Sequence, residues 1–464
     1  MSVSRRTFLT ALGTGSVAAP LVGLPSLLSA LDVRRAGRVA RPRPSSAQLQ
    51  WQRDELALFL HFGVNTFTDR EWGDGTESPS IFAPEALDCR QWARAAKAAG
   101  ARALILTAKH HDGFCLWPTA TTRHSVVSSP FRGGQGDVVR EFTDACRAEG
   151  LRAGLYLSPW DRNHPTYGDS PRYNAVYREQ LTELLTRYGP IHEVWFDGAN
   201  GEGPNGKRQV YDWPATWGLV KQLQPDAVIF SDAGPDVRWI GNEIGVAGET
   251  NWSTVNPATV PVPGLSGDEV MRSLREGDRD GTVWRPGETD VSIRPGWFWH
   301  PAEDAKVRTP ENLEQLWFTS VGRNSKLLLN VPPTRAGLLH DTDVRHLALM
   351  RARLDAVFGD ELTVDAAHRW SVRDARQARH EAVFTRAATI GTVDLAEDIA
   401  QGQRVASFTL SARVNGTWTE VLRGSTIGYR RAQRIAPVTA DALQLDVLDA
   451  VEVPLPVSVR AYRA

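Results

Sequence analysis

The chain has 464 residues, of which 42% are hydrophobic and 23% are charged, and its 53 basic and 54 acidic residues give a formal net charge of −1. A chain of this size and composition can bury a large core and form more than one domain. Lys and Arg are scattered without a basic track or an acidic tail, so we expect no nucleic-acid partner. The spacing of Cys89, Cys115 and Cys146 fits neither a zinc site nor a disulfide framework; it predicts buried thiols, with one disulfide pair left open.

Residues 1–33 have the pattern of an export signal. Arg5 and Arg6 precede Phe8 and Leu9 and a Gly/Ala-rich apolar run, which resembles a bacterial twin-arginine signal. The apolar run is too short and too rich in glycine for a membrane span, although an uncleaved N-terminal anchor is the alternative. We therefore expect export to the periplasm or the cell exterior, no membrane span in the mature protein, and a polar linker at residues 34–48.

From residue 49 to residue 360, apolar segments alternate with amphipathic ones, a pattern typical of a parallel sheet wrapped by helices. No G-x-G-x-x-G follows the first strand, so a (β/α)8 barrel is favoured over a doubly wound sheet. Gly100, Gly150 and Gly189 end three of the helices and are expected to cap them in the left-handed conformation. The strands are expected within residues 56–67, 101–114, 151–160, 191–198, 226–234, 237–243, 291–300 and 325–333.

Residues 361–464 differ from the barrel segment, because short strand-like runs such as QRVASFTLSARV and PLPVSVRAY follow one another without intervening helices. The length of this segment is about that of one β-sandwich, and we expect a second, all-β domain of that kind.

Polar side chains recur at the carboxyl ends of five predicted strands, the face on which barrel enzymes carry their chemistry. Each of them alone is readily explained as a satisfied core residue, but core polarity has no reason to fall at the same end every time. The residues are His61, the pair His110 and His111 with Asp112, Tyr156 with Trp160, Asp197, and Glu243.

Two chemistries would suit such a rim. A metal hydrolase needs His and carboxylate ligands with one open position. Neighbouring residues on a strand point to opposite faces, so His110 and His111 are not expected to share one ion, and we expect no metal. A retaining glycosidase instead needs two carboxyl groups about 5 to 5.5 Å apart, and Asp197 and Glu243 at the ends of different strands are suitable partners.

Six segments resemble the α-L-fucosidases of glycoside hydrolase family 29. They are, in chain order, FLHFGVNTF, EWGDG, KHHDGFCLW, YLSPWD, EVWFDGANG and LLLNVPP, and the resemblance covers about residues 50 to 335. It implies that Asp197, in the W-F-D-G segment, is the nucleophile and that no cofactor is needed. It also implies that His61, Trp72, His110 and His111 bind fucose, and Tyr156 and Trp160 are expected to line the same site.

The acid/base residue has no motif common to the whole family. DVRWIGNEIG resembles the branch that cleaves α-1,3- and α-1,4-linked fucose from branched Lewis-type glycans, in which the glutamate of G-N-E is the acid/base; this implies Glu243. Glu249, Asp232 and Asp236 remain alternatives from the sequence. SIRPGWFWHPAED also resembles that branch, so Arg294, Trp297 and His300 are expected to contact the sugar beyond fucose.

The resemblance implies a retaining exo-α-L-fucosidase whose partner is a fucosylated oligosaccharide or glycoconjugate. Fucose carries a methyl group, so its site should combine an apolar wall with hydrogen-bonding groups for the hydroxyls, and Phe62, Trp72 and the three histidines offer both. Two other hypotheses are kept: a non-catalytic glycan-binding protein that retains the site, and an α-L-fucosidase of broad specificity.

Overall fold

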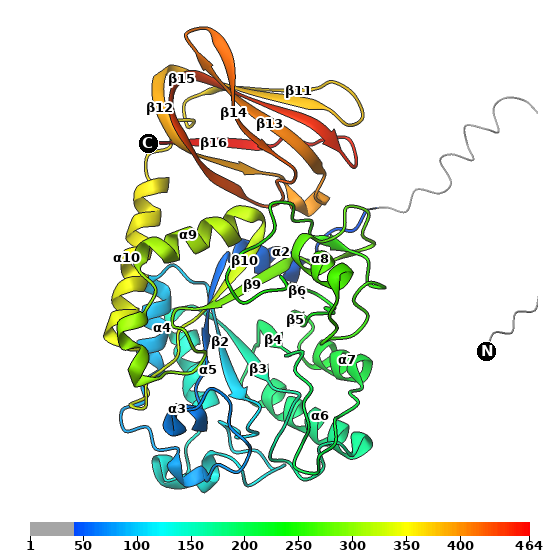
Figure 1. Cartoon of the computed structure of the whole chain (residues 1–464), viewed down its shortest axis with the longest axis vertical. Coiled ribbons are helices and arrows are strands. Elements are labelled where there is room, and N and C mark those ends of the chain that lie inside the picture. Colours follow the sequence, from blue (N-terminus) through cyan, green and yellow to red (C-terminus); the bar gives the residue numbers. More distant parts are fainter. Residues whose placement is uncertain (1–40) are drawn as a thin grey trace, which may run out of the picture. The chain divides into compact units, whose positions relative to one another are not determined.

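The computed structural model of the chain describes residues 41–464 (Figure 1). The predicted export signal at residues 1–33 and the first seven residues of the predicted linker lie outside the described residues. Helix α2 (Ser46–Arg53) begins inside the last three residues of that linker. A reciprocal capping box starts it, in which Ser45 Oγ accepts from the Gln48 N–H and the Gln48 side chain accepts from the Ser45 N–H.

Eight parallel strands form the main sheet, in the order β5-β4-β3-β2-β1-β10-β9-β6. A parallel bridge between Phe230 and Val237 joins its two edges, so the sheet is a nearly closed barrel, and the predicted fold class is confirmed. The strands are β1 (Leu56–Leu60), β2 (Ala103–Lys109), β3 (Arg152–Leu157), β4 (Glu193–Trp195), β5 (Val228–Phe230), β6 (Arg238–Trp239), β9 (Gly287–Ser292) and β10 (Ser325–Asn330). A small antiparallel pair, β7 (Thr254–Val255) and β8 (Val283–Trp284), lies in the connection from β6 to β9.

Helices lie around the strands in Figure 1. Gly100, Gly150 and Gly189, which follow α4, α5 and α6, have φ values of 85°, 72° and 79°, so the predicted left-handed caps are confirmed. The helices of the barrel unit are α3 (Val64–Thr68), α4 (Cys89–Ala98), α5 (Val138–Glu149), α6 (Ser170–Arg187), α7 (Trp213–Leu223), α8 (Asp268–Glu276), α9 (Pro310–Ser320) and α10 (Asp341–Phe358).

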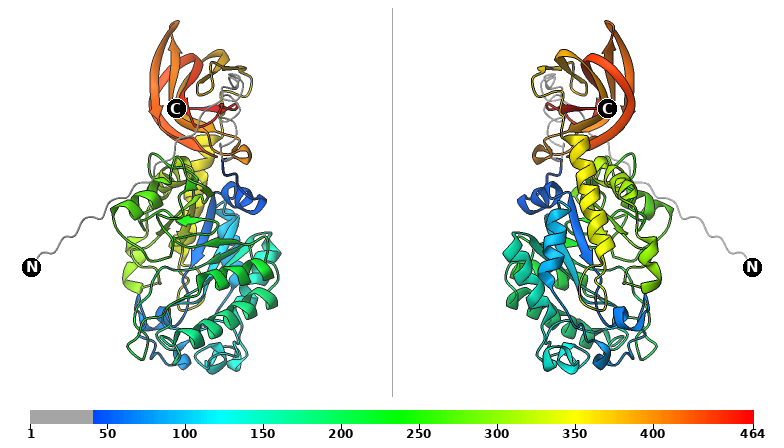
Figure 2. Two further views of the ribbon diagram at one scale, coloured as in Figure 1. Left: turned by 90° about the vertical axis from the view of Figure 1, so that its right-hand side faces the viewer. Right: turned by 90° about the vertical axis from the view of Figure 1, so that its left-hand side faces the viewer.

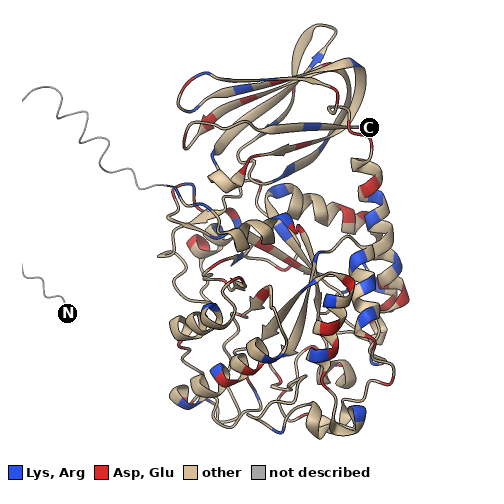
Figure 3. Cartoon of the chain, turned by 180° about the vertical axis from the view of Figure 1, so that it is seen from behind, with Lys and Arg blue, Asp and Glu red and all other residues tan. Residues whose placement is uncertain are grey.

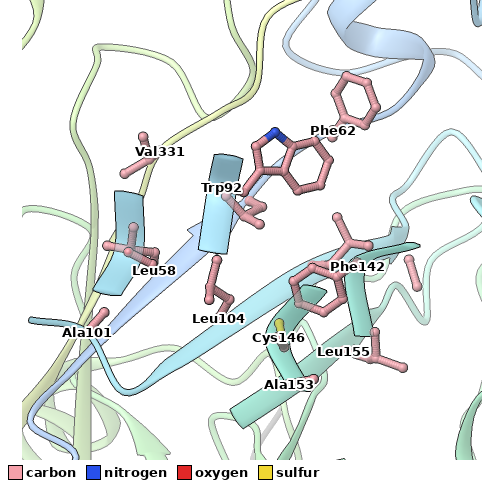
Figure 4. Close-up of a cluster of buried hydrophobic side chains, with 14 of the residues drawn as sticks. Leu58, Phe62, Trp92, Ala101, Leu104, Phe142, Cys146, Ala153, Leu155 and Val331 are labelled. Carbon is pink, nitrogen blue, oxygen red and sulfur yellow. The ribbon is translucent and has the colours of Figure 1, made fainter. Parts of the chain in front are cut away.

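The strands are apolar on both faces because both faces are buried. Leu58, Leu104 and Leu155 pack outward against Trp92 of α4 and Phe142 of α5, as the close-up in Figure 4 shows. The residues next to them along the chain, such as Phe59 and Ile105, belong to a second cluster that fills the barrel interior. Parallel strands covered on both sides therefore have near-continuous hydrophobic sequences rather than alternating ones.

The seventh barrel strand was predicted at residues 291–300, and most of that prediction was wrong. Strand β9 ends at Ser292, and the residues from Ile293 to His300 form a loop. The strand instead begins at Gly287 and carries the buried polar residues Glu288 and Asp290. Polar residues at alternate positions of a fully buried strand do not match the apolar pattern of its neighbours, so the strand was not recognised.

The C-terminal segment forms an antiparallel all-β unit, as predicted. Strand β12 pairs with β15 along most of its length. The other edge of β12 pairs with β11 over its first part and with β16 over its last part, so β12 and β15 extend through the whole length of the curved sheet (Figure 2). The strands are β11 (Ala367–Val372), β12 (Ala378–Ala396), β13 (Val405–Val414), β14 (Thr417–Gly424), β15 (Arg431–Ala450) and β16 (Ser458–Arg463). Their inner face carries a separate hydrophobic core that includes Phe408, Leu410 and Leu443.

Arg430 links the all-β unit to the amino end of the barrel. Its Nη1 lies 2.7 Å from Glu55 Oε1, and Glu55 directly precedes β1. Its Nη2 lies 3.0 Å from Asp394 Oδ2, and the guanidinium covers the Trp317 ring of α9 at 4.7 Å from the centroid. The all-β unit thus makes these contacts on the side of the barrel opposite the carboxyl ends of the strands.

The remaining composition-based predictions concern thiols and charge. Cys89, Cys115 and Cys146 are all buried and unpaired, as predicted for structural thiols. Acidic and basic residues are interspersed along the ribbon of the described chain (Figure 3). Within residues 41–464, no helix combines the length and the apolar character needed to cross a bilayer.

Candidate active site

A cavity of about 220 Å³ opens at the carboxyl ends of the barrel strands. It brings together eight of the predicted site residues, which come from the ends of six strands and from the loops that follow them. Its lining consists of Phe59, His61, Trp72, His110, His111, Tyr156, Trp195, Asp197, Ala199, Glu243, Asp290 and Trp297.

Asp197 stands two residues beyond the end of β4 and is held at the cavity wall by two hydrogen bonds. Its Oδ1 accepts from the backbone N–H of Ala199 at 2.7 Å. Its Oδ2 accepts from the Tyr156 hydroxyl at 3.2 Å and lies 3.9 Å from His111 Nε2. The glycine that follows is required by space, because a Cβ at Gly198 would lie 2.4 Å from Asp232 Oδ2. The two hydrogen bonds fix the orientation of the Asp197 side chain.

The hydrogen-bond network assigns the tautomer of His61. Asn330 Nδ2 donates to the Trp297 carbonyl at 2.8 Å, so Asn330 Oδ1 must be the oxygen that accepts from His61 Nδ1 at 2.8 Å. Burial lowers the pKa of His61 to about 3, so the ring is neutral and Nε2 is left as an acceptor.

His111 is fixed in the same way. Ser158 Oγ donates to the Trp160 carbonyl at 2.7 Å and therefore accepts from His111 Nδ1 at 2.7 Å. Burial lowers the pKa of His111, although the Asp197 charge acts against that shift. His111 Nε2 is thus a second acceptor at the cavity.

The two adjacent histidines do not point to opposite faces. The assumption behind the argument that they would not share one metal ion is therefore wrong. Strand β2 ends at Lys109, so the alternation of a strand no longer applies to His110 and His111, and their ring centroids lie 4.1 Å apart in the same wall. Burial and the neighbouring His111 and His61 lower the pKa of His110 well below its usual value. Within residues 41–464, no group of three His, Cys, Asp or Glu side chains is arranged to hold a metal ion.

Glu243 reaches the same cavity from the loop after β6, where it remains exposed at the rim. Burial against the wall is the largest influence on the pKa of Glu243 and raises it. The Trp297 side chain donates a hydrogen bond that acts in the opposite direction, and the charges of Asp197 and Glu71 raise the pKa further. Asp197 and Glu243 thus face one cavity in different environments.

The three alternatives to Glu243 occupy other positions. Asp232 lines an adjoining cavity of about 170 Å³, which also borders Asp197 and Glu243, and burial raises the pKa of Asp232 to about 6. Glu249 is ion-paired with Arg323 and Arg431, and Asp236 with Lys221. Neither Glu249 nor Asp236 lines either cavity.

The predicted tryptophans have different roles. Trp72 is 56% exposed, and its ring is perpendicular to the His111 ring with the centroids 5.8 Å apart. Trp297 packs at 5.1 Å from the His61 ring on the other side of the cavity. Trp160 does not line the cavity; its ring lies behind Trp72 and His111, at 5.9 and 5.0 Å, and its Nε1 donates to the Glu202 carbonyl.

The position of Arg294 does not match the predicted contact with sugar. Its guanidinium is fully buried, with Nε 2.8 Å from Asp343 Oδ2 and Nη1 2.7 Å from Asp304 Oδ1. It therefore anchors the loop after β9 to α10 instead of lining the cavity. His300 likewise binds protein carboxylates, with Nδ1 2.9 Å from Asp69 Oδ1 and Nε2 3.0 Å from Glu71 Oε2.

Sequence reasoning missed two acidic residues of the site. Glu71 accepts from the backbone N–H groups of Trp297 and Phe298, at 2.5 and 3.3 Å, and so ties the loop that carries Trp297 to the segment that carries Trp72. Its position directly before Trp72 in EWGDG was the available signal. Asp290 lines the cavity from β9, and the misplaced strand concealed it.

Comparisons with known proteins agree with this geometry. The model of the α-L-fucosidase family matches residues 50–356. The chain is 45% identical to α-L-fucosidase 1 of Arabidopsis thaliana, over 86% of this chain and 82% of that protein. A crystal structure of a glycoside hydrolase family 29 member from an unknown rumen bacterium is 42% identical, with a TM-score of 0.85 over 92% of this chain and 78% of that chain. A family 29 fucosidase of Ruminococcus gnavus, solved in complex with fucose, is 30% identical, with a TM-score of 0.83 over 92% of this chain and 97% of that chain. With its nearly closed barrel and its carboxylate-lined cavity, this chain belongs to the α-L-fucosidase family of glycoside hydrolases.

Proposed function

We propose that this α-L-fucosidase is a retaining exo-enzyme that releases α-1,3- and α-1,4-linked L-fucose from branched Lewis-type glycans. Asp197 is the nucleophile and Glu243 the acid/base. The observation that carries the proposal is that these two carboxyl groups line one cavity, one held by two hydrogen bonds and the other with a raised pKa.

The reaction follows from these two environments. Asp197 attacks the anomeric carbon, and the bond from that carbon to the glycosidic oxygen breaks as Glu243 gives its proton to the leaving oxygen. Water then attacks the fucosyl ester and gives a proton to the Glu243 carboxylate, which restores Asp197. A raised pKa keeps Glu243 protonated for the first step.

The cavity supports a terminal sugar as the substrate. Its volume of about 220 Å³ lies below the range of about 300–1,000 Å³ for most ligand pockets, which favours one monosaccharide ring. Trp72 offers an exposed aromatic face, and His61 and His111 offer acceptors to hydroxyl groups. The adjoining cavity beside Asp232 and Trp239 leaves room for the sugar to which fucose is attached.

The linkage preference rests on the sequence from Gly241 to Glu243 and on the loop from Ile293 to His300. Fucose release from Lewis a, Lewis x, an α-1,2-linked H-type glycan and an aryl fucoside tests it directly. We expect the Lewis glycans to be preferred, because binding energy from the branch supports catalysis. Equal or faster hydrolysis of the α-1,2 linkage would reject this assignment in favour of a broad-specificity enzyme.

The mechanism is tested with Asp197→Gly and Glu243→Ala. The Asp197 variant should lose several orders of magnitude in activity for every leaving group, whereas the Glu243 variant should be impaired most on glycans with poor leaving groups. Azide should give the retained α-azide with Glu243→Ala and the inverted β-azide with Asp197→Gly. Equal loss on activated and unactivated substrates, without an α-azide, would exclude Glu243 as the acid/base.

Export by the twin-arginine route is also part of this proposal and rests on Arg5 and Arg6. Fractionation of cells that express the full chain should recover activity outside the cytoplasm, and Arg5→Lys combined with Arg6→Lys should retain it inside. Unchanged export of the double variant would refute this route.

A further inference from the structure

Asp290 is a third carboxyl group in the wall of the catalytic cavity. It is only 4% exposed and lies on β9, opposite Leu328 of β10 in the barrel register. It borders the same cavity as Asp197 and Glu243, and also the adjoining cavity. The two-carboxyl mechanism does not use it.

The surroundings of Asp290 disfavour a second negative charge. Among residues 41–464, no Lys, Arg or His forms an ion pair with Asp290, and Glu243 and Asp197 are the charged groups with the largest effect on it. Burial and these two acids raise its pKa well above the usual value, while the Trp239 hydrogen bond acts in the other direction. A carboxyl group without a cation, buried beside two others, is expected to keep its proton.

Trp239 determines which oxygen carries that proton. Its indole Nε1 can only donate, and it lies 2.8 Å from Asp290 Oδ1. Oδ1 is therefore the acceptor, and the proton resides on Oδ2. We propose that Asp290 is a neutral carboxylic acid throughout the reaction and that its Oδ2–H positions Glu243 by donating a hydrogen bond to it. This inference rests on the proposed role of Glu243 as the acid/base.

The charges of the two steps agree with this role. Before the first step, Asp197 is the one ionised group among the three carboxyls. After it, Asp197 is an uncharged ester, and Glu243 holds the single negative charge. A neutral Asp290 donates a hydrogen bond to the Glu243 carboxylate in that second state, and the net charge of the three carboxyl groups stays at −1. An ionised Asp290 would instead oppose the deprotonation of Glu243.

Other titratable groups near Asp290 do not supply the missing cation. On its own strand Glu288 lies two residues away, fully buried, with a raised pKa. His61 and His110, from β1 and β2, have lowered pKa values and are neutral. On β10, Asn330 has no charge and is bound to His61, and the Lys326 ammonium is paired with Glu193 at 2.9 Å.

Asp290→Asn and Asp290→Ala separate the neutral acid from the carboxylate. In the asparagine, Oδ1 still accepts from Trp239 and the amide N–H donates where the acid O–H did. The alanine lacks the donor and leaves the half-buried Trp239 indole N–H without this partner. Asp441→Asn is the matched control, because Asp441 pairs with Arg413 on the surface of the all-β unit.

The assay is kcat/KM on a Lewis glycan as a function of pH. For Asp290→Asn we expect a loss of no more than about threefold and an unmoved alkaline limb, because the amide has the charge of the neutral acid. For Asp290→Ala we expect a loss of about tenfold to a hundredfold, since a donor to a charged group is removed. Asp441→Asn should match the wild type throughout.

Two outcomes would overturn the inference. If Asp290 were ionised, Asp290→Asn would remove a negative neighbour of Glu243, and the alkaline limb would move to lower pH by about one unit. If Asp290→Ala, folded by its melting profile, kept wild-type kcat/KM, no donor would be in use. Azide trapping with Glu243→Ala tests the acid/base assignment of Glu243 separately. The comparison of kcat/KM between Asp290→Asn and Asp290→Ala at neutral pH does not depend on the result of that trapping.

Discussion

Lys326 is the cation of a fully buried cluster below the active site, and Lys326→Met tests its contribution to stability. Its Nζ lies 2.9 Å from Glu193 Oε2 and 3.7 Å from Glu288 Oε2, with all three side chains at 0% exposure. Trp51 Nε1 donates to Glu193 at 2.8 Å, and Trp195 Nε1 donates to Glu288 at 3.0 Å. Methionine has a similar length but removes the charge.

The expected loss in the free energy of unfolding follows from the protonation of the two buried glutamates. Burial and the neighbouring Glu193 raise the pKa of Glu288 well above its usual value, so Glu288 is already neutral, and the ammonium compensates Glu193. Without Lys326, one further glutamate must take up a proton when the chain folds. The ordinary pKa of glutamate is about 4.3, so this protonation costs about 3.7 kcal/mol at pH 7 and about 1 kcal/mol at pH 5. The value at pH 7 agrees with the loss of about 3–5 kcal/mol on breaking a buried ion pair.

Urea unfolding at pH 7 and pH 5 measures this difference. Lys326→Met should be destabilised most at pH 7, and the double variant Lys326→Met, Glu193→Gln should recover most of the loss, because the glutamine needs no added proton. Lys97→Met is the matched control: Lys97 pairs with Glu149 at 3.5 Å on the surface and should change the free energy of unfolding by less than about 0.5 kcal/mol. Equal destabilisation at both pH values, without recovery in the double variant, would refute this account.

Three further predictions concern the cavity, its acid and the all-β unit. Trp72→Ala should lower kcat/KM by about fivefold to thirtyfold through loss of stacking area, with an unchanged melting temperature because Trp72 is exposed; a drop in melting temperature would contradict this. Glu243→Gln should abolish the alkaline limb of kcat/KM that the wild type shows on a Lewis glycan, because that limb reports loss of the Glu243 proton and glutamine has none to lose; a limb that persists in the residual activity would assign it to another group. Arg430→Met should destabilise the chain by about 3 kcal/mol or more in urea, because it leaves the buried Asp394 with less compensation and Glu55 without its partner; a change under about 0.5 kcal/mol would show that this contact is not stabilising.

Much of the fold was predictable because its signals are local. Apolar runs of a few residues and glycines at helix ends mark most of the barrel elements, and the glycines have the expected positive φ. Strand β9 lacked such a signal, since Glu288 and Asp290 interrupt its apolar pattern. Their burial depends on Trp195 and Trp239, which lie some 50 to 90 residues away in the chain and donate to them. Local pattern cannot reveal partners at that separation.

The candidate site was predictable to the extent that residues follow strand ends. Asp197, Glu243 and the histidines were located by that rule, and the acid/base role of Glu243 by the resemblance. Arg294 was assigned to sugar because its segment, SIRPGWFWHPAED, resembles the α-1,3/1,4 branch, yet its guanidinium turns to Asp343 of α10. The direction of a long side chain is decided by the most favourable charge within reach, which only the tertiary structure supplies.

The locked tautomers of His61 and His111 separate recognition from proton transfer. Both rings are tied through Nδ1 and have lowered pKa values, so neither should gain a charge across the pH range in which the carboxyl groups exchange protons. Each Nε2 then accepts a hydrogen bond whatever the stage of the reaction, and a ligand must answer with a hydroxyl that donates. A fluorine or a methyl ether in place of such a hydroxyl has no proton to donate, so it would leave the lone pair of the histidine Nε2 without a hydrogen bond. The cavity can thus distinguish sugars by their O–H groups through the histidines, while the carboxyl groups carry out the proton transfer.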